Sequence, residues 1–145
     1  MNRTTALVTG GLAATVVAAT AAAMPALAAS DAKTVTQHFD AKSSASPLFF
    51  SKTSFASTDK DVRGGKTIGR DVLSCTDAGQ GSSHCYVAFA QKGGLLYVKF
   101  ALSDKTGALK GTVTGGTGSF AHANGTLAGQ AVSHSDVKIT LHYQK

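Results

Sequence analysis

Several residue types are scarce or missing in this sequence. Of its 145 residues, none is tryptophan and none is glutamate, and there are two cysteines, two prolines and two methionines. Both methionines, Met1 and Met24, lie near the N-terminus. Glutamate and methionine are good helix formers, and the apolar residues show no sustained helical period. The sequence therefore disfavours a helical fold.

The N-terminus has the pattern of an export signal. Arg3 precedes a stretch rich in Ala and Val, Pro25 interrupts it, and Ala26 and Ala28 supply small residues two positions apart. Thr and Gly residues dilute this stretch, and the acidic Asp31 follows it, so a membrane anchor fits less well. We predict a signal peptide over residues 1–28 and a secreted protein that is not stably inserted in a membrane.

The remaining residues, 29–145, are enough for one modest core and too few for a catalytic domain with a separate cofactor domain. They contain both cysteines, Cys75 and Cys85. An exported chain meets an oxidising compartment, which favours a disulfide over a thiol nucleophile or a metal pair. We predict a disulfide between them.

Short alternating apolar runs, separated by glycine or aspartate clusters, are typical of β-strands. In residues 136–144, Val137, Ile139 and Leu141 share one face, and polar residues occupy the other. Short connections imply antiparallel neighbours, and closing the sheet removes its exposed edges. We predict an all-β fold, a single eight-stranded antiparallel β-barrel of calycin-like type, with two stacked sheets as the alternative. The expected strands are 33–40, 48–57, 66–76, 84–91, 95–102, 108–114, 125–133 and 136–144.

The run at 66–76, the strand opened by Cys85, the glycine pair at 93–94 and the glycine-rich hairpin at 111–126 resemble bacterial members of the allene oxide cyclase and dirigent barrel superfamily. The resemblance spans residues 62–145. It implies an eight-stranded barrel with an apolar central cavity, no cofactor, and assembly as a homodimer or homotrimer. Plant cyclases of this superfamily use a buried glutamate, which this chain lacks.

Polar residues inside strands are the candidates for a pocket. A carboxylate in an apolar barrel would have a raised pKa and could act as acid or base, with tyrosine hydroxyls orienting an oxygen of the ligand. We select Asp71 and Tyr97 as candidate catalytic residues. The candidates for lining a ligand pocket are His38, Tyr86 and Phe100.

Other classes of site fit less well. Asp59, Asp61, Asp77 and Asp104 lie among Gly, Lys and Ser, where capping of turns accounts for them. The five histidines share no ligand spacing, so no metal site is predicted. The net charge is +6, but the lysines are scattered and form no stripe, which argues against nucleic-acid binding.

Three hypotheses of function follow. The first is a secreted barrel that binds a small hydrophobic molecule without changing it. The second is a cofactor-free cyclase, isomerase or dirigent-type enzyme that guides ring closure or coupling. The third is a structural protein of the cell envelope with a packed barrel.

Overall fold

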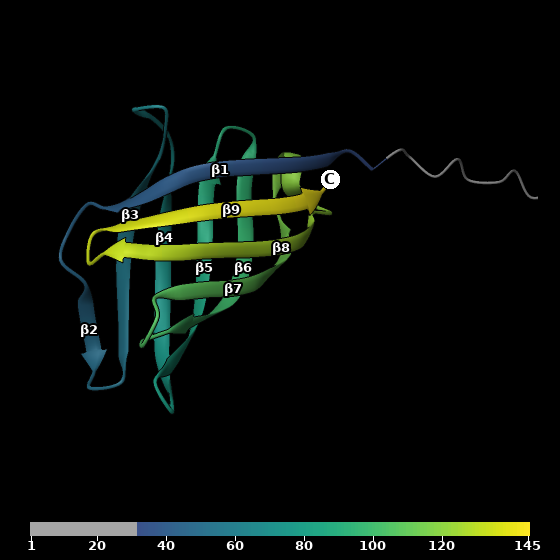
Figure 1. Ribbon diagram of the computed structural model, residues 1–145. Coiled ribbons are helices and arrows are strands. Elements are labelled where there is room, and N and C mark those ends of the chain that lie inside the picture. The colour runs from purple at the N-terminus through teal and green to yellow at the C-terminus, as the bar shows by residue number, and fades with distance from the viewer. Residues whose placement is uncertain (1–31) are drawn as a thin grey trace, which may run out of the picture.

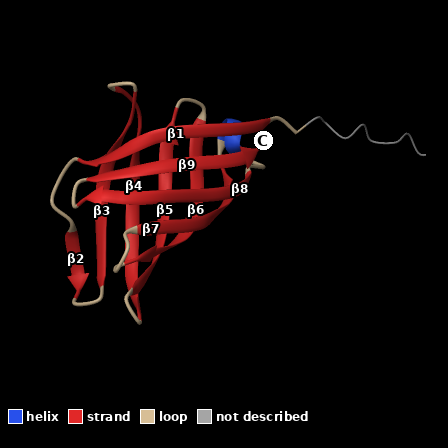
Figure 2. Ribbon diagram, viewed as in Figure 1, coloured by secondary structure: helices blue, strands red, loops and turns tan. Residues whose placement is uncertain are grey.

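The structure is a computed structural model that describes residues 32–145. The predicted signal peptide lies outside the described residues. Nine strands and one short 3-10 helix follow one another along the chain (Figure 2). The strands are β1 (Thr34–Ser43), β2 (Leu48–Ser51), β3 (Ser54–Arg63), β4 (Lys66–Gly79), β5 (Ser82–Gln91), β6 (Gly94–Ser103), β7 (Ala108–Gly116), β8 (Asn124–Ser133) and β9 (Asp136–Gln144), and the helix is η1 (Gly118–Phe120).

Eight of these strands form a closed antiparallel barrel. Each of β3 to β8 pairs with the next strand along the chain, β1 pairs with β9, and β1 also pairs with β3 to close the sheet. Figure 1 shows β1, β9, β8 and β7 crossing in front of β3 to β6. The predicted eight-stranded barrel is confirmed.

One predicted strand is misplaced. The expected strand at 48–57 is in fact the short β2, a tight turn and the beginning of β3, which continues to Arg63. β2 pairs only with β3 and lies outside the barrel. The prediction stopped at Ser57 because the inward positions of β3 that follow, Asp59 and Asp61, carry charge where the alternation rule expects apolar residues.

The barrel closes along a short seam. β1 and β3 share only four residue pairs, from Asp40 opposite Val62 to Ser43 opposite Asp59. By contrast, the pairing of β1 with β9 runs from Thr34 opposite Gln144 to Lys42 opposite Asp136. The seam therefore joins the last residues of β1 to the second half of β3.

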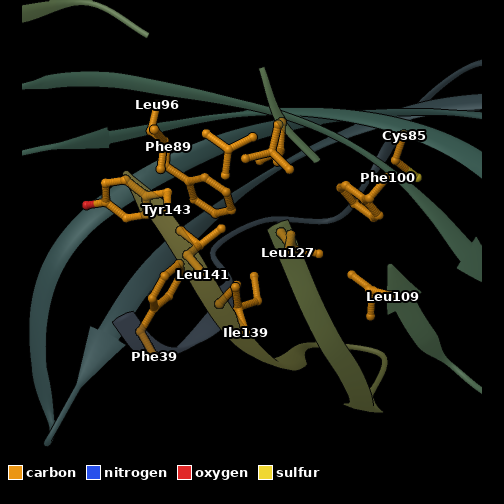
Figure 3. Close-up of a cluster of buried hydrophobic side chains, with 14 of the residues drawn as sticks. Phe39, Cys85, Phe89, Leu96, Phe100, Leu109, Leu127, Ile139, Leu141 and Tyr143 are labelled. Atoms are coloured by element: carbon orange, nitrogen blue, oxygen red, sulfur yellow. The ribbon is translucent and has the colours of Figure 1, made fainter. Parts of the chain in front are cut away.

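Inward-facing apolar side chains fill most of the barrel, as period-2 alternation requires (Figure 3). At one end, Phe120 from η1 and Tyr143 from β9 pack with ring centroids 6.1 Å apart, and both side chains are almost fully buried. The Tyr143 hydroxyl accepts a hydrogen bond from Gln37 Nε2 at 3.2 Å. Packed aromatic rings thus occupy this end, which we call the closed end.

The predicted disulfide is present. Cys75 on β4 and Cys85 on β5 are directly opposite each other, bonded and 1% exposed. Reduction of this bond should lower the free energy of unfolding by about 2.5–3 kcal/mol, because it cross-links a short loop of the unfolded chain. Thermal unfolding with and without reductant measures the effect. An unchanged melting temperature, with both thiols shown to be free, would contradict the prediction.

Candidate functional site

Three aspartates point into the barrel from two neighbouring strands. Asp59 and Asp61 are on β3, Asp71 is on β4, and their exposed fractions are 7%, 0% and 3%. Asp59 and Asp71 are opposite each other in the β3–β4 ladder. Residues two apart in a strand share a face, so Asp61 lies on the same inner face as Asp59. We call these residues the aspartate cluster.

Local sequence makes room for the cluster. Asp61 is opposite Gly69 of β4, where a Cβ atom would lie 2.8 Å from Asp61 Oδ2 and 2.6 Å from the carbonyl oxygen of Ala90. Glycine is thus needed at position 69 for this close approach. Immediately beyond this pair the register shifts, because β4 carries one extra residue, Ile68. Such bulges re-aim neighbouring side chains and are frequent next to functional sites.

The cluster faces the small space that remains inside the barrel. An interior cavity of about 30 Å³ is lined by Asp59 and Asp71 together with apolar side chains that include Phe100. This volume holds a water molecule but no substrate. The ligand-sized central cavity implied by the family resemblance is therefore absent from this conformation, because side chains such as Phe89 and Phe100 fill it (Figure 3).

A larger pocket opens at the end of the barrel where β1 finishes and β3 begins. Its volume is about 290 Å³, close to the lower limit for small-molecule sites, and we call it the mouth pocket. Its lining residues are Ala41, Ser43, Pro47, Phe55, Ser57, Asp59, Leu73, Leu102, Ala131, Ser133, His134, Ser135 and Val137. Ala41, Asp59, Leu73 and Val137 also line the interior cavity, so the two spaces adjoin, with Asp59 at their boundary.

Burial changes the acidity of all three carboxyl groups. The pKa of Asp71 is raised to about 9 by loss of solvation, by the charges of Asp59 and Asp61, and by a hydrogen bond with Asp61. Loss of solvation also raises the pKa of Asp61 to about 6, with a further contribution from the charge of Asp59. The pKa of Asp59 is raised by burial, against a hydrogen bond from Ser43 Oγ at 2.9 Å. At neutral pH, Asp71 therefore carries a proton.

The predicted site residues fall into two groups. Asp71 and Phe100 line the interior cavity. The side chains of Tyr86 and Tyr97 instead share an outer groove and are 67% and 38% exposed. His38 is also exposed, with Nδ1 3.0 Å from Thr140 Oγ1. The structure does not bring His38, Tyr86 and Tyr97 into one pocket with Asp71, because alternation along their strands turns these three side chains outward.

Asp59 and Asp61 were missed as site residues. Their neighbours in sequence suggested turn capping, but both are in the middle of a strand. The available signal was the alternation of Ser57, Asp59 and Asp61 with Thr58 and Lys60, which has the period of a strand with a polar inner face. Asp77 does act at a turn, where its Oδ1 accepts a hydrogen bond from the backbone N–H of Gly79 at 2.7 Å.

Residues 32–145 contain no group of three or more His, Cys, Asp or Glu side chains placed to hold a metal ion. In the same range, no helix has the length and apolar character required to span a bilayer.

Solved structures share this barrel fold. A pyocyanin demethylase superposes with a TM-score of 0.64 at 22% identity, covering 75% of this chain and 99% of that one. A second structure is a nonspecific heme-binding cyclase that catalyses a [4 + 2] cycloaddition during neoabyssomicin biosynthesis. It superposes with a TM-score of 0.64 at 11% identity, covering 78% of this chain and 64% of that one. The Diels Alderase AbmU from Streptomyces koyangensis superposes with a TM-score of 0.60 at 10% identity, covering 81% of this chain and 71% of that one. No protein-family model and no curated protein matches the sequence. The chain thus has the same small β-barrel fold as these three proteins.

Proposed function

We propose that this protein is a secreted relative of the allene oxide cyclase and dirigent barrels that binds a small, largely apolar molecule in its mouth pocket. The observation that carries the proposal is the position of Asp59, a buried carboxylate on the boundary between an open apolar pocket and the barrel interior. Apolar walls with a few convergent polar groups are the usual composition of small-molecule sites. The disulfide supports export, since such bonds persist in oxidising compartments.

A titration of the purified protein with the neutral dye N-phenyl-1-naphthylamine tests this proposal. We expect saturable binding at one site per chain. Ala131 lines the mouth pocket, so Ala131→Phe should weaken binding by at least about tenfold through loss of space. The matched control is Ala128→Phe on the outer face of the same strand, which should bind as the wild type does. Equal binding by both variants, or no saturable binding, would refute the proposed pocket.

A second candidate function is cofactor-free isomerisation or cyclisation of the bound molecule. The observation that favours it is the proton on Asp71 at neutral pH, next to the carboxylate of Asp61. Asp71 could donate this proton to a carbonyl or ether oxygen of the substrate and recover a proton from the same molecule as the ring closes. Such a reaction conserves all atoms and electrons and needs no cofactor.

The two candidates differ in what happens to the ligand. Incubation with an organic extract of the source culture, followed by mass spectrometry, should show either an unchanged bound compound or an isomer of equal mass and different retention. For an enzyme, Asp71→Asn should abolish formation of the isomer while the dye still binds. Isomer formation at the wild-type rate by Asp71→Asn would exclude Asp71 as the acid.

A further inference from the structure

We infer that the molecule bound in the mouth pocket is an organic cation with an apolar body, whose positive charge is placed against Asp59, beside the interior cavity that Asp71 lines. This inference rests on the proposed function, because it names the chemical class of the ligand for the same pocket. It follows from the distribution of charge between the inside and the outside of the barrel.

The charges inside and outside the barrel have opposite signs. All lysines and arginines of residues 32–145 are exposed, although the whole chain has a net charge of +6. Inside the barrel, the buried charged residues are Asp59, Asp61 and Asp71. The salt bridge found in the described part of the chain joins Lys42 and Asp136 and involves none of them. The aspartate cluster therefore has no cationic partner within residues 32–145.

The hydrogen bonding of the cluster is also incomplete. Asp71 Oδ1 is buried without a hydrogen-bond partner, and this side chain lines the interior cavity. Within residues 32–145, neither oxygen of Asp61 forms a hydrogen bond of standard geometry. The donors directed toward them are the proton of Asp71 and Gln91 Nε2, which is itself unpaired. Ser43 Oγ supplies the one side-chain hydrogen bond to Asp59. Buried carboxylates normally have a cation, a metal ion or several donors as partners.

The shape of the site selects the kind of cation. The three carboxylates are not arranged to hold a metal ion. The mouth pocket is lined mainly by apolar side chains, among them Phe55 and Leu102, and has room for a molecule of about two fused rings. An apolar ring system bearing an ammonium or iminium nitrogen matches both the walls and the carboxylates. Its charge would be stabilised in a medium of low polarity, where opposite charges attract strongly.

Proton release provides a specific signature of such a ligand. In the empty site Asp71 keeps its proton because Asp59 and Asp61 are charged and solvent is excluded. A cation next to Asp71 would favour its ionised form and expel this proton. The affinity for a cation should therefore rise with pH, whereas that for a neutral molecule should not.

Two uncharged side chains and one histidine also lie near the aspartate cluster. Gln91 of β5 is uncharged and lies beside Gly69, the residue opposite Asp61. Ser43 of β1, which donates a hydrogen bond to Asp59, is also uncharged. His134, in the turn between β8 and β9, is the other titratable side chain that lines the mouth pocket besides Asp59. The test therefore includes a His134→Gln variant.

Two aromatic probes of nearly equal shape test the inference: the cation N-methylquinolinium and the neutral 1-methylnaphthalene. Calorimetric titration at pH 8 should show the cation binding at least about tenfold more tightly, as expected for a charge-assisted contact. Its affinity should rise severalfold from pH 6 to pH 8, in the wild type and in His134→Gln alike. Repeating the titration in buffers of different ionisation enthalpy should reveal release of a proton on binding.

Matched variants locate the effect. Asp59→Asn should weaken binding of the cation about tenfold and leave binding of the neutral probe unchanged. Asp40→Asn removes an equal charge from the outer face of β1, the strand that pairs with β3 at the seam. It should change the affinity for neither probe. Circular dichroism of both variants verifies that they are folded.

The outcomes separate this inference from the proposed function. Binding of neither probe would overturn the proposed pocket. Equal binding of both probes at every pH, or binding of the cation without proton release, would overturn the cationic ligand while the pocket stands. Loss of the pH dependence in His134→Gln would assign the effect to the histidine and also overturn the inference.

Discussion

Replacing Asp71 with Asn should raise the melting temperature of this protein at pH 8 by at least about 5–10 °C, and should raise it much less at pH 5. The amide has the shape of the protonated carboxyl group and can still donate a hydrogen bond to Asp61. In the wild type at high pH, Asp71 loses its proton when the chain unfolds, and this deprotonation favours the unfolded state. The substitution removes this effect because the amide does not titrate.

The sign follows from proton binding in the two states. In the folded protein the pKa of Asp71 is about 9 and that of Asp61 about 6, whereas an aspartate in an unfolded chain has a pKa near 3.9. Between about pH 4 and pH 9 the folded state holds protons that the unfolded state has lost. The free energy of unfolding therefore falls as pH rises, for Asp71 by up to about 1.4 kcal/mol per pH unit.

Thermal unfolding of wild type, Asp71→Asn and the outer-face variant Asp40→Asn at several pH values tests this prediction. The wild type should be most stable at mildly acidic pH, and Asp71→Asn should have a shallower dependence on pH. Asp40→Asn should follow the wild type. A wild-type protein that gains stability from pH 5 to pH 8, or an Asp71→Asn variant that is equally destabilised at both, would contradict the raised pKa.

Replacing Phe100 with Ala should destabilise the protein by about 3–5 kcal/mol and enlarge the site. Phe100 is 8% exposed and lines the interior cavity, which adjoins the mouth pocket through shared residues that include Leu73 and Val137. Removing the ring should extend the pocket toward the barrel centre. We expect tighter binding of N-phenyl-1-naphthylamine, measured by fluorescence titration, and a lower midpoint of urea unfolding.

A variant at the other end of the barrel separates the two effects of this substitution. Phe120 is 2% exposed and does not line the interior cavity or the mouth pocket. Phe120→Ala should cost a similar free energy of unfolding without improving binding of the dye. Improved binding by Phe120→Ala to the same extent would show that loosening of the barrel, and not the enlarged pocket, accounts for the gain.

The sequence predicts the barrel better than it predicts the site. Alternation in strands such as β9, together with the glycine-rich turns, is a local property that the fold preserves. The pairing of Cys75 with Cys85 follows from their being the only two cysteines. These features need no knowledge of which strands meet across the barrel.

The site depends on features that break the same rules. Asp59 and Asp61 occupy inward positions where apolar residues are expected, and the sequence pattern therefore placed them in a turn. Exceptions of this kind are concentrated at functional sites. Tyr86 and Tyr97 attract attention as polar aromatics, yet only the register of their strands shows that both face outward. Pairing across strands, which brings Asp59 opposite Asp71, is not encoded in any local window.

The packing of Phe120 against Tyr143 at the closed end determines how molecules are exchanged. With that end blocked, the mouth pocket serves both for entry and for exit. An occupant must leave before its successor can enter, so exchange proceeds by dissociation followed by a new encounter. For a carrier, the residence time of the cargo then sets the pace of delivery. For an enzyme, product and substrate exclude one another, and product inhibition is competitive.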